Sequence, residues 1–132
     1  MASIDTFHCS VITPERAVLE TEATFVAFPA HDGEVGILHN RAPLLYKMGI
    51  GELRVESPEG NHRFFVDGGF AQMVENRLTI LTEQAKEPSE IDRAAAERAL
   101  AEARALPMTD DTAFAARQRA VKRAEAQLKL VS

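Results

Sequence analysis

The feature that most constrains the fold is a change in residue use near Ala85. Between Ile91 and Ser132 the sequence holds thirteen alanines, and alanine is the strongest helix former. Before Ala85, apolar residues come in short runs separated by turn residues, which is typical of a β-sandwich or barrel. The sequence predicts an all-β sandwich of about ten short strands over residues 1–86, followed by an antiparallel two-helix hairpin over residues 87–132.

Strands in the first part are indicated by alternating apolar residues and β-formers. Alternation marks Phe7–Val11 and Leu53–Val55, and Thr24–Phe28 is rich in β-formers. The segments Phe70–Val74 and Leu78–Thr82 are predicted to form a hairpin around residues 75–77. Three glycine-containing segments break the strands: Asp32-Gly33 is a hairpin dipeptide, residues 57–60 form a turn cluster, and Gly68-Gly69 allows a bulge or kink. Pro29 and Pro43 are expected at strand ends or edges.

The helices are indicated by caps and breakers. Ser89 and Asp92 match a capping box, so a helix is expected to begin near residue 90 and to end at Leu106-Pro107. N-cap candidates for a second helix lie in residues 109–112. The expected apolar stripes are mostly alanine and bury little area, so the hairpin is expected to be marginal alone: Ile91, Ala95, Ala99, Ala103 and Leu106, then Phe114, Val121, Ala124, Leu128 and Val131.

Charge and targeting signals narrow the class of protein. The net charge of −5 argues against nucleic-acid binding, which depends on lysine and arginine meeting phosphates. Cys9 is the only cysteine, so no internal disulfide is expected. The sequence shows no signal or transit peptide and no spanning segment, so membrane association is expected only through other proteins.

The histidines and the cysteine are the candidate catalytic and metal-binding residues of the chain. These residues lack metal-ligand spacing and fall on expected strands and loops, so no catalytic or metal role is expected for them: His8, Cys9, His31, His39 and His62. The glycines near Gly33 and Gly49 do not precede a helix in P-loop register. We expect a protein that is not an enzyme and holds no cofactor. A small hydrolase using His31 or His39 with a carboxylate is an alternative class.

Three segments together carry a family resemblance. They are residues 32–45, which read DGEVGILHNRAPLL, with Phe65–Phe70 and Leu78–Leu81. This set resembles the epsilon subunit of bacterial F-type (F1Fo) ATP synthase over nearly the whole chain. The resemblance implies a rotor subunit of the central stalk that couples proton flow through the c ring to ATP synthesis. It also implies contacts with gamma, the c ring, alpha and beta, at the cytoplasmic face of the bacterial cell membrane.

The resemblance implies a c-ring and gamma interface at Glu34, Val35, His39 and Arg41. Glu34 is expected in a loop that faces the c ring; otherwise it is a solvated turn carboxylate. The family has Pro-Gly-His where this chain has His39-Asn40-Arg41, so the pairings of this loop are expected to differ.

In relatives, the hairpin inserts among alpha and beta and blocks ATP hydrolysis. Here Arg119, Lys122 and Arg123 are expected to contact acidic residues of beta. Some relatives bind ATP through an I/L-D-x-x-R-A motif, which makes Ile91, Asp92 and Arg123 nucleotide candidates. Ala95 replaces the motif's arginine, however, so the phosphate-binding fork is missing there.

An alternative function is open on the residues alone. The chain could be a free-standing β-sandwich binding module that oligomerises through its hairpin. That reading predicts self-association through the apolar stripe of Phe114, Val121 and Leu128.

Overall fold

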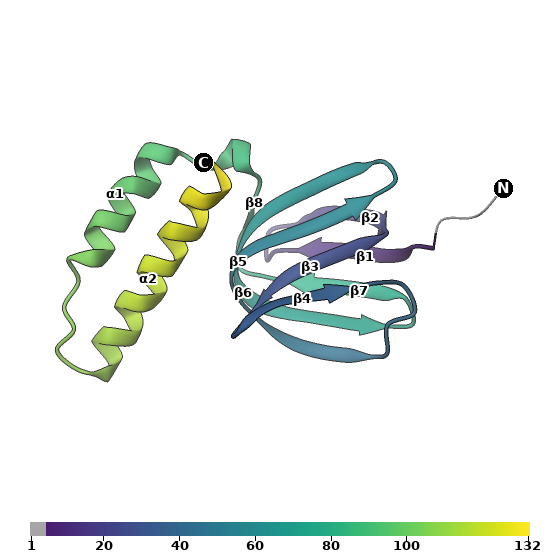
Figure 1. The fold of residues 1–132 in the computed structure, drawn as a ribbon, viewed down its shortest axis with the longest axis horizontal. Helices are drawn as coiled ribbons and strands as arrows, with labels where there is room; N and C mark the ends of the chain where they lie inside the picture. The colour runs from purple at the N-terminus through teal and green to yellow at the C-terminus, as the bar shows by residue number, and fades with distance from the viewer. Residues whose placement is uncertain (1–4) are drawn as a thin grey trace.

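The computed structural model describes residues 5–132 and shows two layers of strands with a pair of helices at one end (Figure 1). The predicted sandwich and hairpin are confirmed. Eight strands are present instead of about ten, because β5 and β6 are 14 and 15 residues long. The elements are β1 Phe7–Ile12, β2 Ala17–Ala23, β3 Phe25–Ala30, β4 Gly33–Ile37, β5 Leu44–Ser57, β6 Gly60–Val74, β7 Arg77–Leu81, β8 Ala85–Lys86, a 3₁₀ helix Pro88–Glu90, α1 Arg93–Arg104 and α2 Asp111–Leu130.

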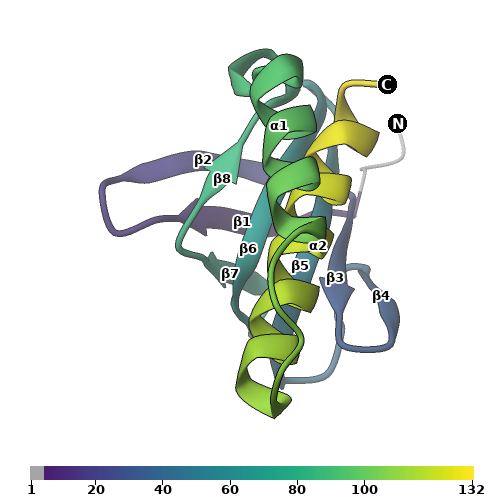
Figure 2. The same ribbon diagram turned by 90° about the vertical axis from the view of Figure 1, so that its left-hand side faces the viewer.

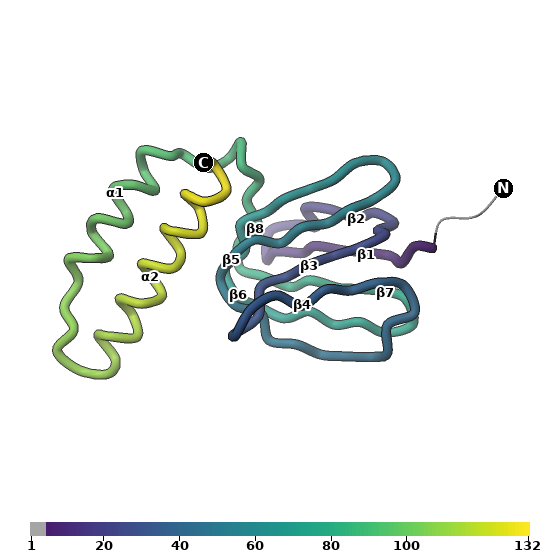
Figure 3. The backbone as a smooth tube through the Cα atoms, in the orientation of Figure 1, coloured from purple at the N-terminus to yellow at the C-terminus, as the bar shows by residue number. Residues whose placement is uncertain are grey.

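The two layers are one continuous sheet that folds over at β5 and β6. The strand order is β2-β1-β7-β6-β5-β3-β4, and β8 pairs with β6. The β5–β6 ladder skips Gly49 and Gly68. Both strands bend from one layer into the other at the end of the sandwich beside the helices (Figure 3). Gly68 and Gly69 have φ of 70° and 106°, and a Cβ on Gly69 would overlap the carbonyl oxygen of Leu81. Only glycine fits this bend.

Most predicted breaks fall at turns of the structure. The β3–β4 turn is His31-Asp32, and Pro43 directly precedes β5. Pro29 lies inside β3, where the register with β5 shifts between Ala27 and Ala30, so the missing N–H costs no regular ladder bond. The β6–β7 turn contains residues 75 and 76 alone, because β7 already begins at Arg77.

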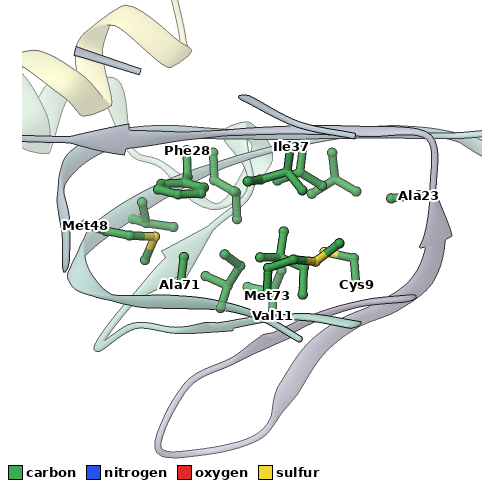
Figure 4. Packing of buried hydrophobic residues seen from close by; sticks show 14 of the residues in the cluster. Cys9, Val11, Ala23, Phe28, Ile37, Met48, Ala71 and Met73 are labelled. Carbon is green, nitrogen blue, oxygen red and sulfur yellow. The ribbon is translucent and has the colours of Figure 1, made fainter. Parts of the chain in front are cut away.

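The main core lies between the two layers. Figure 4 shows Phe28 and Ile37 of one layer facing Val11 and Met73 of the other, and all four are fully buried. Cys9 lies in the same cluster. Burial raises the pKa of its thiol from the ordinary 9.0 to about 12, because the thiolate is not solvated there.

The hairpin packs on the bends of β5 and β6 through α2, and α1 lies on the outer side of α2 (Figures 1 and 2). A second, smaller cluster joins it to the sandwich: Phe65, Ile91 and Leu130 are buried together. Phe65 comes from β6 and points away from the main core, as expected from the alternation of side chains along a strand. The hairpin therefore does not share the core of the sandwich.

The first cap differs from prediction, whereas the N-cap of α2, Asp110, lies within the predicted residues 109–112. Helix α1 begins at Arg93 with Asp92 as its N-cap, whose carboxylate accepts from the Ala95 N–H at 3.2 Å. The predicted capping box at Ser89 is wrong, because Ser89 lies within a 3₁₀ turn whose box is formed by Glu87 and Glu90. The predicted stripe of α2 is confirmed in part: Ala124 is buried and Val131 packs against the second cluster, but Phe114 is 44% exposed and the buried Leu130 lies outside the stripe.

Candidate functional site

The four predicted interface residues do not form one site. Glu34 and Val35 lie in β4, and Glu34 lines a groove of about 310 Å³ with Lys122 and Leu130 of α2. His39 and Arg41 lie in the β4–β5 connection, at the end of the sandwich away from the helices (Figure 3). The structure thus divides them between the two ends of the sandwich.

Glu34 belongs to a network of surface ion pairs. Its carboxylate lies 3.2 Å from Arg54 of β5, and Arg54 lies 3.6 Å from Glu52. Arg63 of β6 completes the network at 2.6 Å from Glu52. The expectation that Glu34 lies in a loop is therefore wrong, because Gly33–Ile37 pairs with β3 as a strand. Val35 is partly buried against the main core.

The β4–β5 connection is held at two points. His39 Nε2 lies 3.4 Å from the Asp5 carboxylate. Asn40 donates its backbone N–H to Asn76 Oδ1 at 2.6 Å and accepts from Asn76 Nδ2 at 2.9 Å. Leu38 is 60% exposed and Arg41 is exposed, so the connection presents an apolar and a basic side chain to solvent.

The three predicted contacts with beta have different surroundings. Arg123 of α2 donates to both carboxylate oxygens of Asp67 of β6, with Nε to Oδ2 at 2.8 Å and a terminal nitrogen to Oδ1 at 3.3 Å. This two-point ion pair ties the hairpin to the sandwich. Arg119 and Lys122 are exposed. The structure therefore leaves two of the three side chains facing solvent and engages the third.

The nucleotide candidates are not gathered around one pocket. Ile91 is buried against Phe65, and Asp92 caps α1. Arg123 lines a groove of about 270 Å³ between the helices, and the rest of that lining is Ala99, Glu102, Ala103, Leu106, Ala120, Ala124 and Gln127. Each candidate thus has a structural partner of its own, and ATP binding stays a prediction.

None of the histidines is buried: His31 is exposed, and His8, His39 and His62 are half-buried. The His39–Asp5 pair is at the surface, with both side chains more than a third exposed, so it does not form the enclosed site that a hydrolase requires. Within residues 5–132, no group of three or more His, Cys, Asp or Glu side chains is placed to hold a metal ion. Neither helix of this described range is both long and apolar enough to cross a bilayer.

One surface was missed by the sequence reasoning. Ile12, Phe70 and Leu81, here called the apolar patch, are register neighbours on β1, β6 and β7. They line a groove of about 350 Å³, and Phe70 and Leu81 are 49% and 48% exposed. The signal was the run Phe70-Ala71-Gln72-Met73-Val74, which is apolar on both faces of its strand and not on the core face alone.

Comparisons with known proteins agree with this architecture. Residues 6–88 match the family model described as the ATP synthase, Delta/Epsilon chain, beta-sandwich domain. The ATP synthase epsilon chain of Rhodopirellula baltica is 41% identical over 121 residues, which is 92% of this chain and 94% of that protein. That of Lawsonia intracellularis is 37% identical over 106 residues, or 79% of this chain and 80% of that protein.

The fold also matches solved structures. A chain in the Euglena gracilis mitochondrial ATP synthase, resolved as OSCP, F1 and c-ring, aligns with a TM-score of 0.86 at 22% identity, over 99% of this chain and 85% of that chain. A chain of the central stalk and c-ring structure of Tetrahymena thermophila mitochondrial ATP synthase aligns with a TM-score of 0.65 at 14% identity, over 95% of this chain and 96% of that chain. The sequence matches cover the sandwich and most of the hairpin, so the chain belongs to the family of ATP synthase epsilon chains.

Proposed function

We propose that the protein is a non-catalytic subunit of the central stalk of a bacterial F-type ATP synthase. It binds gamma and the c ring, and through these contacts it couples proton flow to ATP synthesis. It reaches the cytoplasmic face of the cell membrane as part of the complex. Membership of the epsilon-chain family supports this role, as does the fold shared with chains of structures that contain a c-ring.

The observation that carries the proposal is the apolar patch. Single exposed apolar side chains are ordinary on a protein surface, but a contiguous apolar area beside a groove marks an interaction site. Ile12, Phe70 and Leu81 are such an area, on a sheet face that the hairpin does not cover. We assign this face to gamma, because a permanent subunit contact requires an apolar centre that excludes water.

The test is binding of the full chain to gamma. We expect a 1:1 complex by calorimetry or sizing, and we expect Phe70→Ser with Leu81→Ser to weaken it at least tenfold, because buried apolar anchors dominate interface energies. Phe114→Ser is the matched control, since Phe114 is similarly exposed, at 44%, but lies on α2. Wild-type protein that shows no association with gamma would overturn the proposal. Equal effects of the patch and control variants would move the gamma contact elsewhere.

The end of the sandwich away from the helices is assigned to the c ring. His39 and Arg41 lie there with the exposed Leu38. Glu34 and Val35 lie at the opposite end of β4, and Glu34 would have to exchange Arg54 for a c-ring partner. Their part in the interface stays a prediction. Cross-linking from a cysteine placed at Arg41 to the c ring tests the assignment, and cross-links from a cysteine at Glu34 alone would reverse it.

The hairpin is proposed to inhibit ATP hydrolysis by inserting among alpha and beta. Arg119 and Lys122 are exposed and ready for acidic partners, whereas Arg123 must first leave Asp67. The packed and the inserted hairpin are therefore competing states. Deleting residues 88–132 is expected to raise ATP hydrolysis by the assembled complex and to leave assembly intact. Unchanged hydrolysis would remove the inhibitory role and leave the coupling role standing.

An oligomerising β-sandwich module is the second candidate function. It requires an exposed stripe along α2, but only Phe114 of the three predicted residues is exposed, while Val121 and Leu128 are partly buried. The family assignment favours the first candidate. Self-association of the full chain that Phe114→Ser abolishes would favour the second.

A further inference from the structure

Two asparagines meet at the end of the sandwich away from the helices. Asn40 lies in the β4–β5 connection, residues 38–43, here called the docking loop. Asn76 lies in the β6–β7 turn, 36 positions later in the chain. Both have φ of 59°, a conformation that asparagine accepts more readily than most residues.

The pair makes two hydrogen bonds of opposite direction. The Asn40 backbone N–H donates to Asn76 Oδ1 at 2.6 Å, and Asn76 Nδ2 donates to Asn40 Oδ1 at 2.9 Å. An amide side chain can do this because it carries both a donor and an acceptor. The Asn76 side chain is thereby held at both of its polar atoms.

Asn76 is itself fixed to the body of the sandwich. Its carbonyl oxygen accepts from the His8 N–H of β1 at 2.9 Å, and Val74 pairs with Arg77 across the turn. The docking loop is therefore tied to the β6–β7 hairpin and, through the Asn76 carbonyl, to strand β1. Two hydrogen bonds between exposed residues add little to global stability, so their effect is on the loop.

We propose that Asn40 and Asn76 are positioning residues that hold the docking loop in its binding shape, so that Leu38 and Arg41 meet the partner without reordering. This inference rests on the proposed function, in which the partner is the c ring. A loop ordered before binding loses less conformational entropy on association. The two hydrogen bonds between Asn40 and Asn76, here called the clamp, thus favour binding although neither asparagine has to touch the partner.

The decisive variant is Asn76→Gly. Glycine keeps the positive φ of the turn and the backbone bond to His8, and it removes only the two side-chain hydrogen bonds. Glycine also adds flexibility to the turn. Glu75→Gly is the matched control, because Glu75 is the other residue of the same turn, has φ of 50° and is exposed, yet it makes neither clamp bond.

Asn76→Asp is the rescue variant. A carboxylate oxygen can still accept from the Asn40 N–H, and its second oxygen can accept from the Asn40 amide after that amide rotates. Aspartate also tolerates the turn conformation. A residue with a merely structural role in the turn would not distinguish this variant from the glycine one.

The full chain and its variants are titrated onto ATP synthase complexes that lack this subunit, and amide exchange is measured on the free chain. Asn76→Gly is expected to bind about fivefold more weakly than wild type, the effect of one to two modest hydrogen bonds. It is also expected to speed exchange at the Asn40 amide. Glu75→Gly and Asn76→Asp are expected to bind within about twofold of wild type, and melting temperatures of all variants should agree.

Each outcome decides one claim. Wild-type chain that does not bind the complexes overturns the proposed function and the clamp with it. Wild-type binding with equal affinity for the two glycine variants overturns the clamp alone. Failure of Asn76→Asp to restore affinity, with Asn40 exchange as fast as in Asn76→Gly, also overturns it, because the introduced carboxylate keeps the acceptor.

Discussion

The sandwich and the hairpin are stabilised in different ways. The sandwich buries large side chains between its layers, with Phe28, Ile37 and Leu53 at 0% exposed. The helices bury three alanines and Leu130, and their contact with the strands is one small cluster and one ion pair. A Phe or Leu removes several times more apolar area from water than an alanine does. We therefore expect the sandwich to be stable by itself, whereas the stability of the hairpin depends on its contact with the sandwich.

The difference separates a firmly packed region from one whose displacement costs less free energy. An element that opens at low free-energy cost is drawn from the less stable part of a protein. The second cluster and the Arg123–Asp67 pair can be exchanged for other contacts without disturbing the main core, because Phe65 faces away from it.

Removing a large side chain from the main core should unfold the sandwich. Phe28→Ala is expected to lower the free energy of unfolding by about 3–5 kcal/mol, because it leaves a cavity between the layers. Phe114→Ala, on the exposed side of α2, is expected to change it by less than about 0.5 kcal/mol. Urea denaturation followed by circular dichroism measures both. Similar losses at the two positions would mean that the hairpin shares the core.

Truncating Leu130 should loosen the hairpin alone. Leu130→Ala truncates the buried α2 side chain of the second cluster, and we expect docking of the hairpin to weaken by about 2 kcal/mol. Amide exchange should become faster in α1 and α2 and stay unchanged in β5 and β6. Leu106→Ala, at an exposed position of the same hairpin, is the control. Faster exchange throughout the sandwich would contradict the separation of the two regions.

Breaking the ion pair should have a smaller effect of the same kind. Asp67→Asn is expected to weaken hairpin docking by about 1 kcal/mol, since the Arg123 side chain is 38% exposed and partly screened by water. The effect should shrink in high salt. A double-mutant cycle with Arg123→Gln isolates the pair, and Lys122→Gln serves as the neighbour control. Additive effects of the two substitutions would show that the pair contributes no coupling.

The pH dependence of stability should depend on the burial of Cys9. Because its pKa is about 12 in the folded chain and 9.0 ordinarily, the unfolded thiol loses its proton first. The stabilisation is complete below about pH 9 and decreases as the pH rises from 9 towards 12, by at most about 1.4 kcal/mol per pH unit. Cys9→Ala, compared over this range, should lack that component. Identical slopes would mean that the thiol reaches water.

Much of the fold could be predicted from local signals. The alanine content fixed the helices, and the glycine pair at 68–69 lies at the bend of β6 as expected from its freedom at positive φ. The strand count was too high because β5 and β6 continue through that bend. The capping box at Ser89 failed because a competing box with the same spacing, Glu87 and Glu90, occurs two residues earlier.

The candidate site was less predictable, because it depends on contacts between distant segments. Nothing local to Asn40 indicates Asn76, and nothing local to Arg123 indicates Asp67, 56 positions earlier. The surroundings of Glu34 also depend on a distant segment, since its place in β4 brings its carboxylate beside Arg54 of β5. The apolar patch did leave a local signal in residues 70–74, but a two-faced apolar strand is equally typical of a fully buried strand.

The two long strands that pass through both layers have a mechanical consequence. Thirteen residue pairs join β5 to β6 along their whole length, so the end that carries residues 38–43 and the bend beneath α2 belong to one hydrogen-bonded ribbon. A push or twist at either end is transmitted along covalent backbone rather than through layers that can slide over each other. Such a ribbon gives a small domain stiffness without requiring a larger body.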